Sequence, residues 1–428
     1  MDASARQTQG TVVSAYLWVS GLFALAASLI WAINTVFLLR TGGLTLFQVM
    51  VVNAAFTAAQ LVCEVPTGVV ADTIGRRASM LLAMSTLLIS TLLYVITPMA
   101  GWGFVGFFLA SLILGLGYTF QTGAVEAWLV DALDATGFTG HKERIFARGQ
   151  IAFGAGMLSG SLLGGVIGQL DLSLPFVIRA VLLALVFGVV FAKVHDVGFE
   201  PRALTLSSFG EESRRVFDAG VRFGWHNRVI RPLFAVSAVT GVFFFYAFYA
   251  WQPYVLELLG RDYVWVLGVA QAGFSATGIV GNSLVGRIMR SDDLRRDAAR
   301  VCAATAAAQF AVAAGIAVVG FAFAEPGILP AAIAIALWLT YGLLFGMQGP
   351  VRAAYLNEHI PSAQRATVIS LDALFADGGA AAGQPALGWL SDRASIPVAW
   401  LLGSVGIALS APLYLGSSRA AAEASREA

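Results

Sequence analysis

Asp372, Asp377 and Glu126 are acidic residues that lie in apolar stretches of this sequence, where ionised groups are rare. Asp372 and Asp377 share one apolar run, and Glu126 lies in another. An ionised side chain at the centre of a bilayer costs about 2.5–3.5 kcal/mol on insertion scales, so an isolated acid there favours its protonated form. These three residues are therefore candidates for binding and releasing a proton, and Asp377 should lie nearest the middle of its run. A neutral acid that hydrogen-bonds to a neighbouring helix is the alternative interpretation.

Asp372 and Asp377 are not expected to serve one site together. Five residues separate them, which places their side chains roughly 140° apart around a helix. No lysine or arginine lies at a comparable depth nearby in the sequence. The sequence thus predicts that the two acids serve separate sites and that Asp377, near the middle of its run, has no basic partner.

A second group of charged and small residues occupies the polar turn EVPTGVVADTIGRR, which joins two long apolar runs. Gly68 lets another helix approach closely, and Gly75 permits a tight turn. Asp72 can face a helix N-terminus, where the macrodipole contributes about 0.3–1 kcal/mol. Arg76 and Arg77 can pair with acids and hold the turn on the cytoplasmic side of a membrane. This pattern indicates a short, charged connection between two membrane-spanning helices.

The composition is that of an integral membrane protein. Hydrophobic residues make up 58% of the chain, charged residues only 12%, and the mean hydropathy is +0.78. Soluble domains usually carry about 25% charged residues. The apolar runs are long enough for helices rather than barrel strands. The net charge of +1 argues against nucleic acid as a partner, and Cys63 and Cys302, in opposite halves of the chain, are expected to be unpaired.

Twelve apolar runs are long enough to cross a membrane, since about 20 residues span the hydrocarbon core. Basic residues cluster in alternate connections, which places both termini in the cytoplasm by the positive-inside rule. Alanine and arginine are abundant and lysine is scarce, as in many bacterial proteins. The expected spans are 13–39, 46–71, 78–97, 102–130, 145–169, 174–193, 231–257, 263–288, 298–323, 327–351, 365–388 and 396–416.

The longest polar segment, residues 194–230, divides the spans into two sets of six. Its serines, acids and arginines at 207–217 predict an amphipathic surface helix. The expected fold is therefore an all-α membrane protein with twelve transmembrane helices. Residues 1–193 and 231–428 would form two pseudo-symmetric six-helix bundles joined by a cytoplasmic linker.

The spacing G-x-x-x-D-x-x-G-R-R, from Gly68 to Arg77, resembles the signature loop of the major facilitator superfamily. The resemblance implies that Asp131, at the end of span four, pairs with Arg76, and that Asp72 faces the start of span eleven. Such contacts would lock the cytoplasmic side in the outward-open state. Arg148, which enters span five, can neutralise Glu126 or Asp131. A weaker echo of the spacing, from Gly388 to Asp392, ends span eleven on the opposite face.

The resemblance also implies that spans one, four, seven and ten line the translocation path. Aromatic side chains and a few amides in these spans suit a bulky amphipathic molecule better than a small sugar. Ordinary helix packing is the alternative role for each of these side chains. The candidates are Asn34, Tyr118, Gln121, Tyr246, Tyr249, Tyr341 and Gln348.

The chain departs from the antiporter members of this family at two places. Ser161 stands where their span-five pattern has a proline, and the arginine of their span four is missing between residues 111 and 115. The glycines of span five, at residues 154–165, still permit close helix packing. Both departures weaken an antiporter assignment without affecting the fold.

The sequence favours a transporter over an enzyme. All four histidines fall in loops without metal-ligand spacing, and no nucleophile or nucleotide-binding motif is visible, so no catalytic residue, metal or cofactor is expected. The preferred function is proton-coupled efflux of a small amphipathic molecule by a monomer in the lipid bilayer of a bacterial cytoplasmic membrane. Uptake of a nutrient or metabolite, proton-coupled or facilitative, and a non-transporting sensor on the same fold are the alternatives.

Overall fold

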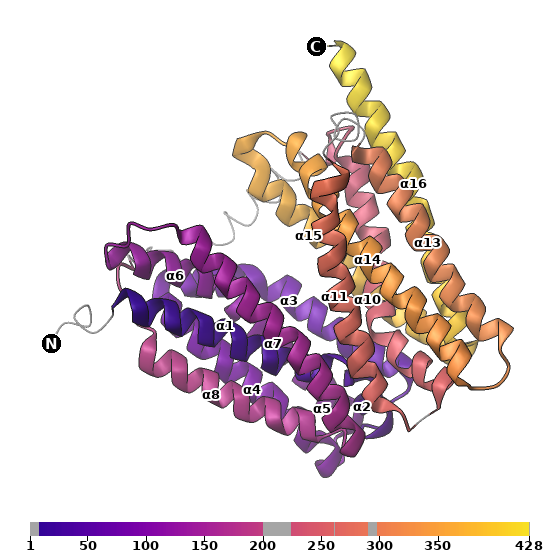
Figure 1. Ribbon diagram of the computed structural model, residues 1–428, viewed down its shortest axis with the longest axis horizontal. Coiled ribbons are helices and arrows are strands. Elements are labelled where there is room, and N and C mark those ends of the chain that lie inside the picture. The colour runs from indigo at the N-terminus through magenta and orange to yellow at the C-terminus, as the bar shows by residue number, and fades with distance from the viewer. Residues whose placement is uncertain (1–7, 200–223, 261, 290–297, 428) are drawn as a thin grey trace. The chain divides into compact units, whose positions relative to one another are not determined.

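The computed structural model describes residues 8–199, 224–260, 262–289 and 298–427, and this part of the chain contains helices and no strand. Figure 1 shows the helices in order. They are α1 (Gln9–Trp31), α2 (Asn34–Arg40), α3 (Leu46–Ile74), α4 (Arg76–Ala100), α5 (Gly103–Gln121), α6 (Ala124–Ala135), α7 (Lys142–Leu170), α8 (Leu174–Lys193), α10 (Arg231–Leu259), α11 (Val264–Ile288), α13 (Ala298–Ala322), α14 (Ile328–Glu358), the short 3-10 helix η3 (Ser362–Gln364), α15 (Arg365–Arg393) and α16 (Ile396–Glu427).

The helices account for all twelve expected spans. Eleven helical segments in the described part of the chain are long and apolar enough to cross a membrane, so the protein is a multi-pass membrane protein. The twelfth, α15, is 29 residues long but less apolar, because it contains Asp372 and Asp377. Two spans are interrupted. The first consists of α1 and α2 with a turn at residues 32 and 33, and the fourth consists of α5 and α6, between which Gly123 adopts a φ of 73°.

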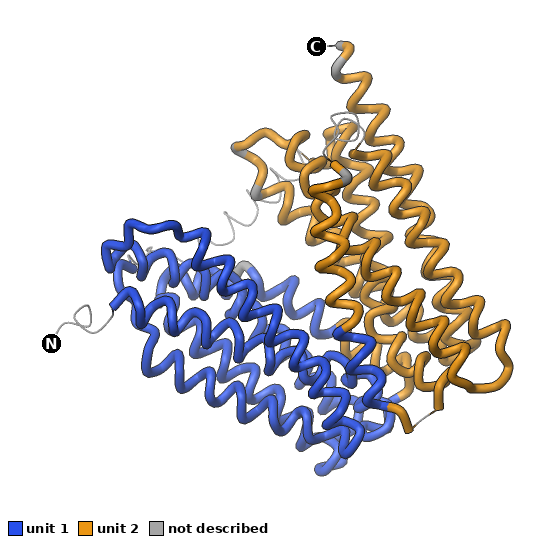
Figure 2. The backbone as a smooth tube through the Cα atoms, in the orientation of Figure 1, with its two compact units in different colours: residues 1–44, 55–206, 264–272 blue, residues 45–54, 207–263, 273–428 orange. Residues whose placement is uncertain are grey.

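The chain forms two compact units, which Figure 2 draws in different colours. Unit 1 comprises residues 1–44, 55–206 and 264–272, and unit 2 comprises residues 45–54, 207–263 and 273–428. Two helices therefore divide their residues between the units. The beginning of α3 belongs to unit 2 and the beginning of α11 to unit 1. The amphipathic helix expected at 207–217 lies outside the described residues.

In unit 1, α1 and α7 run side by side (Figure 1) because glycines remove the side chains between them. A Cβ atom at Gly156, Gly160 or Gly164 would collide with backbone atoms of α1. Gly165 makes an equally close approach to Gly268 of α11, which belongs to the same unit. The close packing expected of the span-five glycines is confirmed.

In unit 2, small residues bring α10 against α15, and large aromatic residues fill the remaining core. A Cβ atom at Gly241 or Gly379 would collide with the backbone of the opposite helix. The ring of Trp338 on α14 stacks on Phe274 at 4.5 Å and on Tyr341 at 5.7 Å between centroids. Residues of α10, α14 and α15 line a cavity whose walls are largely apolar.

Candidate functional site

A cavity of about 500 Å³ lies within unit 2, between helices of the C-terminal half of the chain. Aromatic rings, amides, hydroxyls and three charged side chains share its walls. The parallel rings of Phe244 and Phe345, with centroids 4.5 Å apart, form one apolar surface. Its lining residues are Ser237, Thr240, Gly241, Phe244, Phe245, Gln309, Tyr341, Phe345, Gln348, Gly349, Arg352, Ile369, Asp372, Ala373, Ala376, Asp377 and Tyr414.

An ion pair between Arg352 and Asp372 lies in the wall of this cavity. The Arg352 Nη1 donates to Asp372 Oδ2 at 2.8 Å, and Nη2 donates to Oδ1 at 2.7 Å. The Ser237 hydroxyl donates to the same Oδ1 at 2.6 Å. Arg352 Nη2 also donates to the Leu233 carbonyl at 3.3 Å. The pair therefore ties α10, α14 and α15 together, and the bidentate geometry is the strong form of such a contact.

Arg352 is a functional candidate that the sequence analysis missed. Span ten was expected to end at residue 351, which would leave Arg352 in a loop. In the structure α14 continues through Pro350 to Glu358, so Arg352 reaches Asp372 on the facing helix. Asp372 therefore has a basic partner twenty residues earlier in the chain. No local pattern could have indicated this contact, because twenty residues separate Arg352 from Asp372 in the sequence.

Asp377 lines the same cavity and is half-buried. The expectation that Asp372 and Asp377 belong to separate sites is thus also wrong, because the cavity is wide enough to reach both sides of α15. Among the expected cavity residues, Tyr341 and Gln348 line this site, and the Gln348 amide donates to the Cys302 carbonyl at 3.4 Å.

The other expected cavity residues lie elsewhere. Tyr246 is fully buried and shares a 2.7 Å hydrogen bond with Ser391, and Tyr249 is half-buried outside the lining of the unit 2 cavity. In unit 1, Asn34 is buried, while Gln121 is half-buried at the end of α5. The Tyr118 ring contacts the rings of Phe23 and Phe56, whose centroids lie 5.9 and 5.5 Å from its own.

The signature turn is a compact cluster in unit 1. Arg76 Nη1 lies 2.8 Å from Asp72 Oδ1, one turn away along the chain. Gly75, with a φ of 117°, takes a backbone conformation that only glycine adopts easily, and α4 begins immediately after it. Gly68 has open space around its Cα. Among the described residues no ion pair involves Asp131, so the expected Arg76–Asp131 pair is absent and Asp72 takes its place.

Asp196, just beyond α8, completes this cluster and was not anticipated. Its carboxylate accepts a hydrogen bond of 2.9 Å from the Arg77 backbone N–H in the first turn of α4. The Arg77 guanidinium in turn donates to the Phe191 carbonyl at 2.8 Å. Burial raises the pKa of Asp196, and the N–H groups and charges of Arg77 and Arg76 lower it by less. Asp196 thus supplies the cap that Gly75 cannot give α4.

The echo of the signature spacing also forms a helix cap. Asp392 Oδ1 accepts from Leu46 N at 3.1 Å, and Oδ2 accepts from Phe47 N at 2.9 Å. A Cβ at Gly388 would come within 2.8 Å of Met50 on α3, so the glycine permits this approach. Asp392 therefore binds the first turn of α3, and Gly388, four residues earlier, lets the two helices come close enough. All of these residues belong to unit 2.

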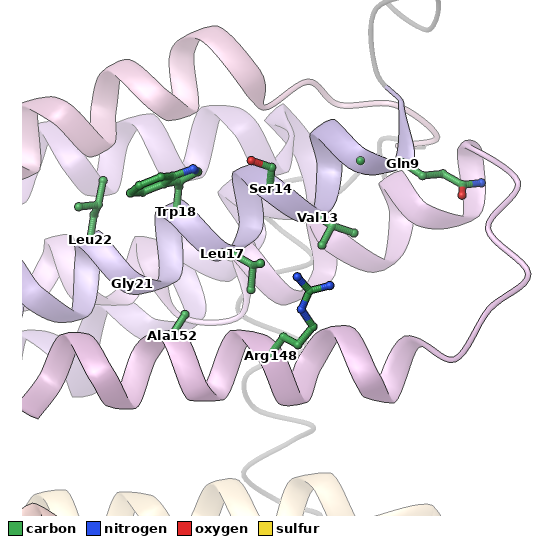
Figure 3. A pocket seen from close by; sticks show the side chains of 10 residues that line it. Gln9, Val13, Ser14, Leu17, Trp18, Gly21, Leu22, Arg148 and Ala152 are labelled. Atoms are coloured by element: carbon green, nitrogen blue, oxygen red, sulfur yellow. The ribbon is translucent and has the colours of Figure 1, made fainter.

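A second cavity, of about 770 Å³, lies within unit 1 between α1 and α7 (Figure 3). Arg148 lines it, and its side chain takes part in no ion pair or hydrogen bond with the described residues. The expected neutralisation of Glu126 or Asp131 by Arg148 is therefore not observed. Glu126 is exposed in the first turn of α6. The described residues contain no cluster of three potential metal ligands.

Comparison with known proteins identifies the family to which these features belong. Residues 16–384 match the sequence model of the Major Facilitator Superfamily. Over 226 residues the chain is 29% identical to the class D tetracycline resistance protein of Salmonella ordonez, covering 53% of this chain and 52% of the relative. Over 216 residues it is 28% identical to the class C protein of Escherichia coli, covering 50% and 49%. The chain thus spans about half the length of the curated relatives it matches.

Solved structures share the fold at low sequence identity. The nucleoside transporter NupG superposes with a TM-score of 0.75 at 12% identity, covering 96% of this chain and 98% of that one. A POT family transporter in complex with 5-aminolevulinic acid gives a TM-score of 0.70 at 14% identity, covering 95% of each chain. At this identity the likeness establishes the fold alone.

Proposed function

Since the chain belongs to the major facilitator superfamily, we propose that it is a secondary active transporter that exports a small amphipathic molecule in exchange for protons. It acts as a monomer in the bacterial cytoplasmic membrane, with both termini in the cytoplasm, by alternating access of two helical bundles. The observation that carries the proposal is the cavity in unit 2, in which carboxylates and a guanidinium lie beside aromatic rings.

Proton coupling is assigned to the acids of α15. Asp372 is held by Arg352 and Ser237, and its side chain is 11% exposed. Removing its charge would leave a guanidinium in the wall without its counter-ion, which is costly. Asp377 lines the same cavity from the next turns of α15 and is half-buried, so solvent in the cavity reaches it. Asp377 is therefore proposed as the residue that exchanges protons, with Asp372 as a largely fixed anion.

The direction of transport is inferred from the sequence relatives. Both curated proteins that match half of the chain are tetracycline resistance proteins. Resistance by a transporter of this family requires movement of a compound out of the cell. The aromatic surface of Phe244 and Phe345 supports a substrate with a flat apolar part, and Gln309 and Gln348 add amide groups that can orient it.

Uptake is the second candidate. Ser161, which replaces the proline of antiporter members, lies fully buried in an uninterrupted α7 that runs from Lys142 to Leu170. The helix distortion that a proline would introduce is absent here. Proton-coupled or facilitative entry of a nutrient or metabolite would need no such distortion.

Proteoliposomes test the proposal. An inside-acid pH gradient is imposed, tetracycline and a panel of amphipathic antibiotics and dyes are added, and lumenal pH is followed. We expect substrate-dependent alkalinisation with wild-type protein, none with Asp377→Asn, and substrate exchange without a gradient in both. Glu325→Gln, which removes an exposed loop carboxylate in unit 2, serves as the matched control. Active transport by Asp377→Asn at the wild-type level would show that coupling resides elsewhere, and nutrient-dependent acidification would favour uptake.

A further inference from the structure

The cavity in unit 1 has a distinct chemical character that the proposed function does not use. Its walls come from two helices, with Arg148 and Ala152 on α7 and eight residues on one face of α1. Gln9 and Ser14 lie at one end, and Leu17, Trp18 and Leu22 follow along α1 (Figure 3). The cavity is therefore polar at one end and apolar at the other, over about 20 Å of helix.

Arg148 is the charged member of this lining, and it lacks a counter-ion among the described residues. It is exposed, its side chain takes part in no ion pair there, and the lining contains no carboxylate. Figure 3 shows its guanidinium directed from α7 toward Val13 and Leu17 of α1. A guanidinium placed in this way offers several N–H donors in a planar fork, which matches a carboxylate, sulfonate or phosphate group.

The apolar end of the cavity is open to a ligand. Trp18 is 55% exposed although it lies within a helix of a membrane protein, and Leu17 and Leu22 are half-buried beside it. Gly21 and Ala152 also line this end, where α1 and α7 approach closely: a Cβ atom on Gly21 would lie 3.6 Å from the Ala152 carbonyl oxygen. The volume of about 770 Å³ falls within the range of about 300–1,000 Å³ typical of sites for small organic molecules.

We propose that this cavity is a second binding site for the transported molecule, distinct from the cavity of unit 2, and that it binds the molecule through an acidic group, so that the substrate is an amphipathic anion. Arg148 holds the acidic group, and Trp18 with Leu17 and Leu22 holds the apolar body. The charge of the lining favours an anion over a cation or a neutral analogue. This inference rests on the proposed function, since it takes the ligand to be the transported solute, but it concerns binding and not coupling or direction.

Binding of three matched fluorescent probes tests the proposal: dansylglycine, which is anionic, dansylamide, which is neutral, and dansylcadaverine, which is cationic. Purified full-length protein is placed in phosphatidylcholine nanodiscs, and dansyl emission is excited through tryptophan. We expect dansylglycine to bind at least tenfold more tightly than the other two. Arg148→Gln should abolish this preference, and Arg148→Lys should keep part of it. Trp18→Phe should lower energy transfer from the protein to bound probe.

Arg144→Gln is the matched control, because Arg144 is an exposed arginine one turn earlier on α7 that does not line the cavity. Its dansylglycine affinity should equal that of the wild type. Equal affinity for the three probes, or equal losses in the two glutamine variants, would overturn the proposal. If dansylglycine binding were lost when phosphatidylglycerol is added, the cavity would be assigned to an acidic lipid headgroup. That result would also overturn the proposal. Failure of proton exchange in proteoliposomes would leave these binding results unchanged, so the two proposals are tested separately.

Discussion

The Arg352–Asp372 pair shows how a charged contact inside a membrane protein depends on both partners. Two hydrogen bonds of 2.8 and 2.7 Å join the side chains, which are 20% and 11% exposed. Loss of one partner of such a pair costs about 3–5 kcal/mol, because the other charge stays buried and unpaired. We therefore expect Asp372→Asn and Arg352→Gln each to lower the unfolding midpoint strongly in detergent.

The double variant Asp372→Asn/Arg352→Gln separates charge from packing. It removes both charges, so it should be markedly more stable than the sum of the single losses predicts, as measured by thermal unfolding of the four proteins. Additive losses would mean that the two side chains act independently.

Sequence reasoning singled out Asp372 because an acid in an apolar run is conspicuous. It missed Arg352 because an arginine near a helix end is an ordinary feature of a membrane protein.

At the scale of the helices, two N-termini receive their caps from distant parts of the chain. Asp196 accepts from the Arg77 N–H at the start of α4, 119 residues away, and Asp392 accepts from Leu46 and Phe47 at the start of α3. Neither cap follows the local serine or aspartate pattern that marks a helix start in a sequence. The sequence therefore predicts where these helices lie but not what holds their first turns.

The cap at α4 should make stability depend on pH. Burial raises the pKa of Asp196 above its usual value, so the folded protein binds this proton more tightly than the unfolded chain does. The free energy of unfolding should then fall as the pH rises from the usual pKa of a carboxyl group through the raised pKa of Asp196 in the folded protein. It should recover on acidification. We expect the difference in melting temperature between wild type and Asp196→Asn to follow this course. Because the Asp196 side chain is only partly removed from solvent, the effect should be small. A constant difference in melting temperature between pH 4 and 7 would contradict this expectation.

The cap at α3 can be tested by its hydrogen-bonding capacity. Asp392→Ala removes both acceptors and should cost about 0.5–2 kcal/mol, as loss of a helix cap does. Asp392→Asn keeps one side-chain oxygen and should lose much less. Unfolding in detergent, followed by circular dichroism, compares the two. If asparagine destabilised as much as alanine, the negative charge beside the helix dipole, and not the hydrogen bonds, would account for the contact.

At the scale of the whole molecule, the count and order of the helices were predictable from the sequence, whereas the close contacts between helices were not. Apolar runs of about 20 residues and the placement of basic residues indicated all twelve spans. The expected boundaries assigned α3 wholly to the first half and α11 wholly to the second. In the structure, residues 45–54 belong to unit 2 and residues 264–272 belong to unit 1. Contacts such as Gly165 with Gly268 depend on tertiary packing, which no local pattern reports.

The signature turn lies at the far end of α3, and its proposed role belongs to the transport cycle of the whole molecule. Asp72 pairs with Arg76 at 2.8 Å, and both are partly exposed, so the pair contributes little to stability by itself. Under the proposed alternating-access mechanism, this cluster stabilises one of the two end states. Asp72→Asn should therefore reduce transport by at least tenfold while folded protein and its melting temperature remain close to wild type.

Substrate flux into proteoliposomes, normalised to the amount of folded protein, measures this effect. Glu143→Gln is the control, because it removes an exposed carboxylate from the beginning of α7 without touching the turn. The comparison separates a gate from a structural contact. A gating residue changes the rate of the cycle at constant stability, since it alters the balance between two folded states. A structural residue would lower the melting temperature and the flux together, and normal flux in Asp72→Asn would rule out the gating role.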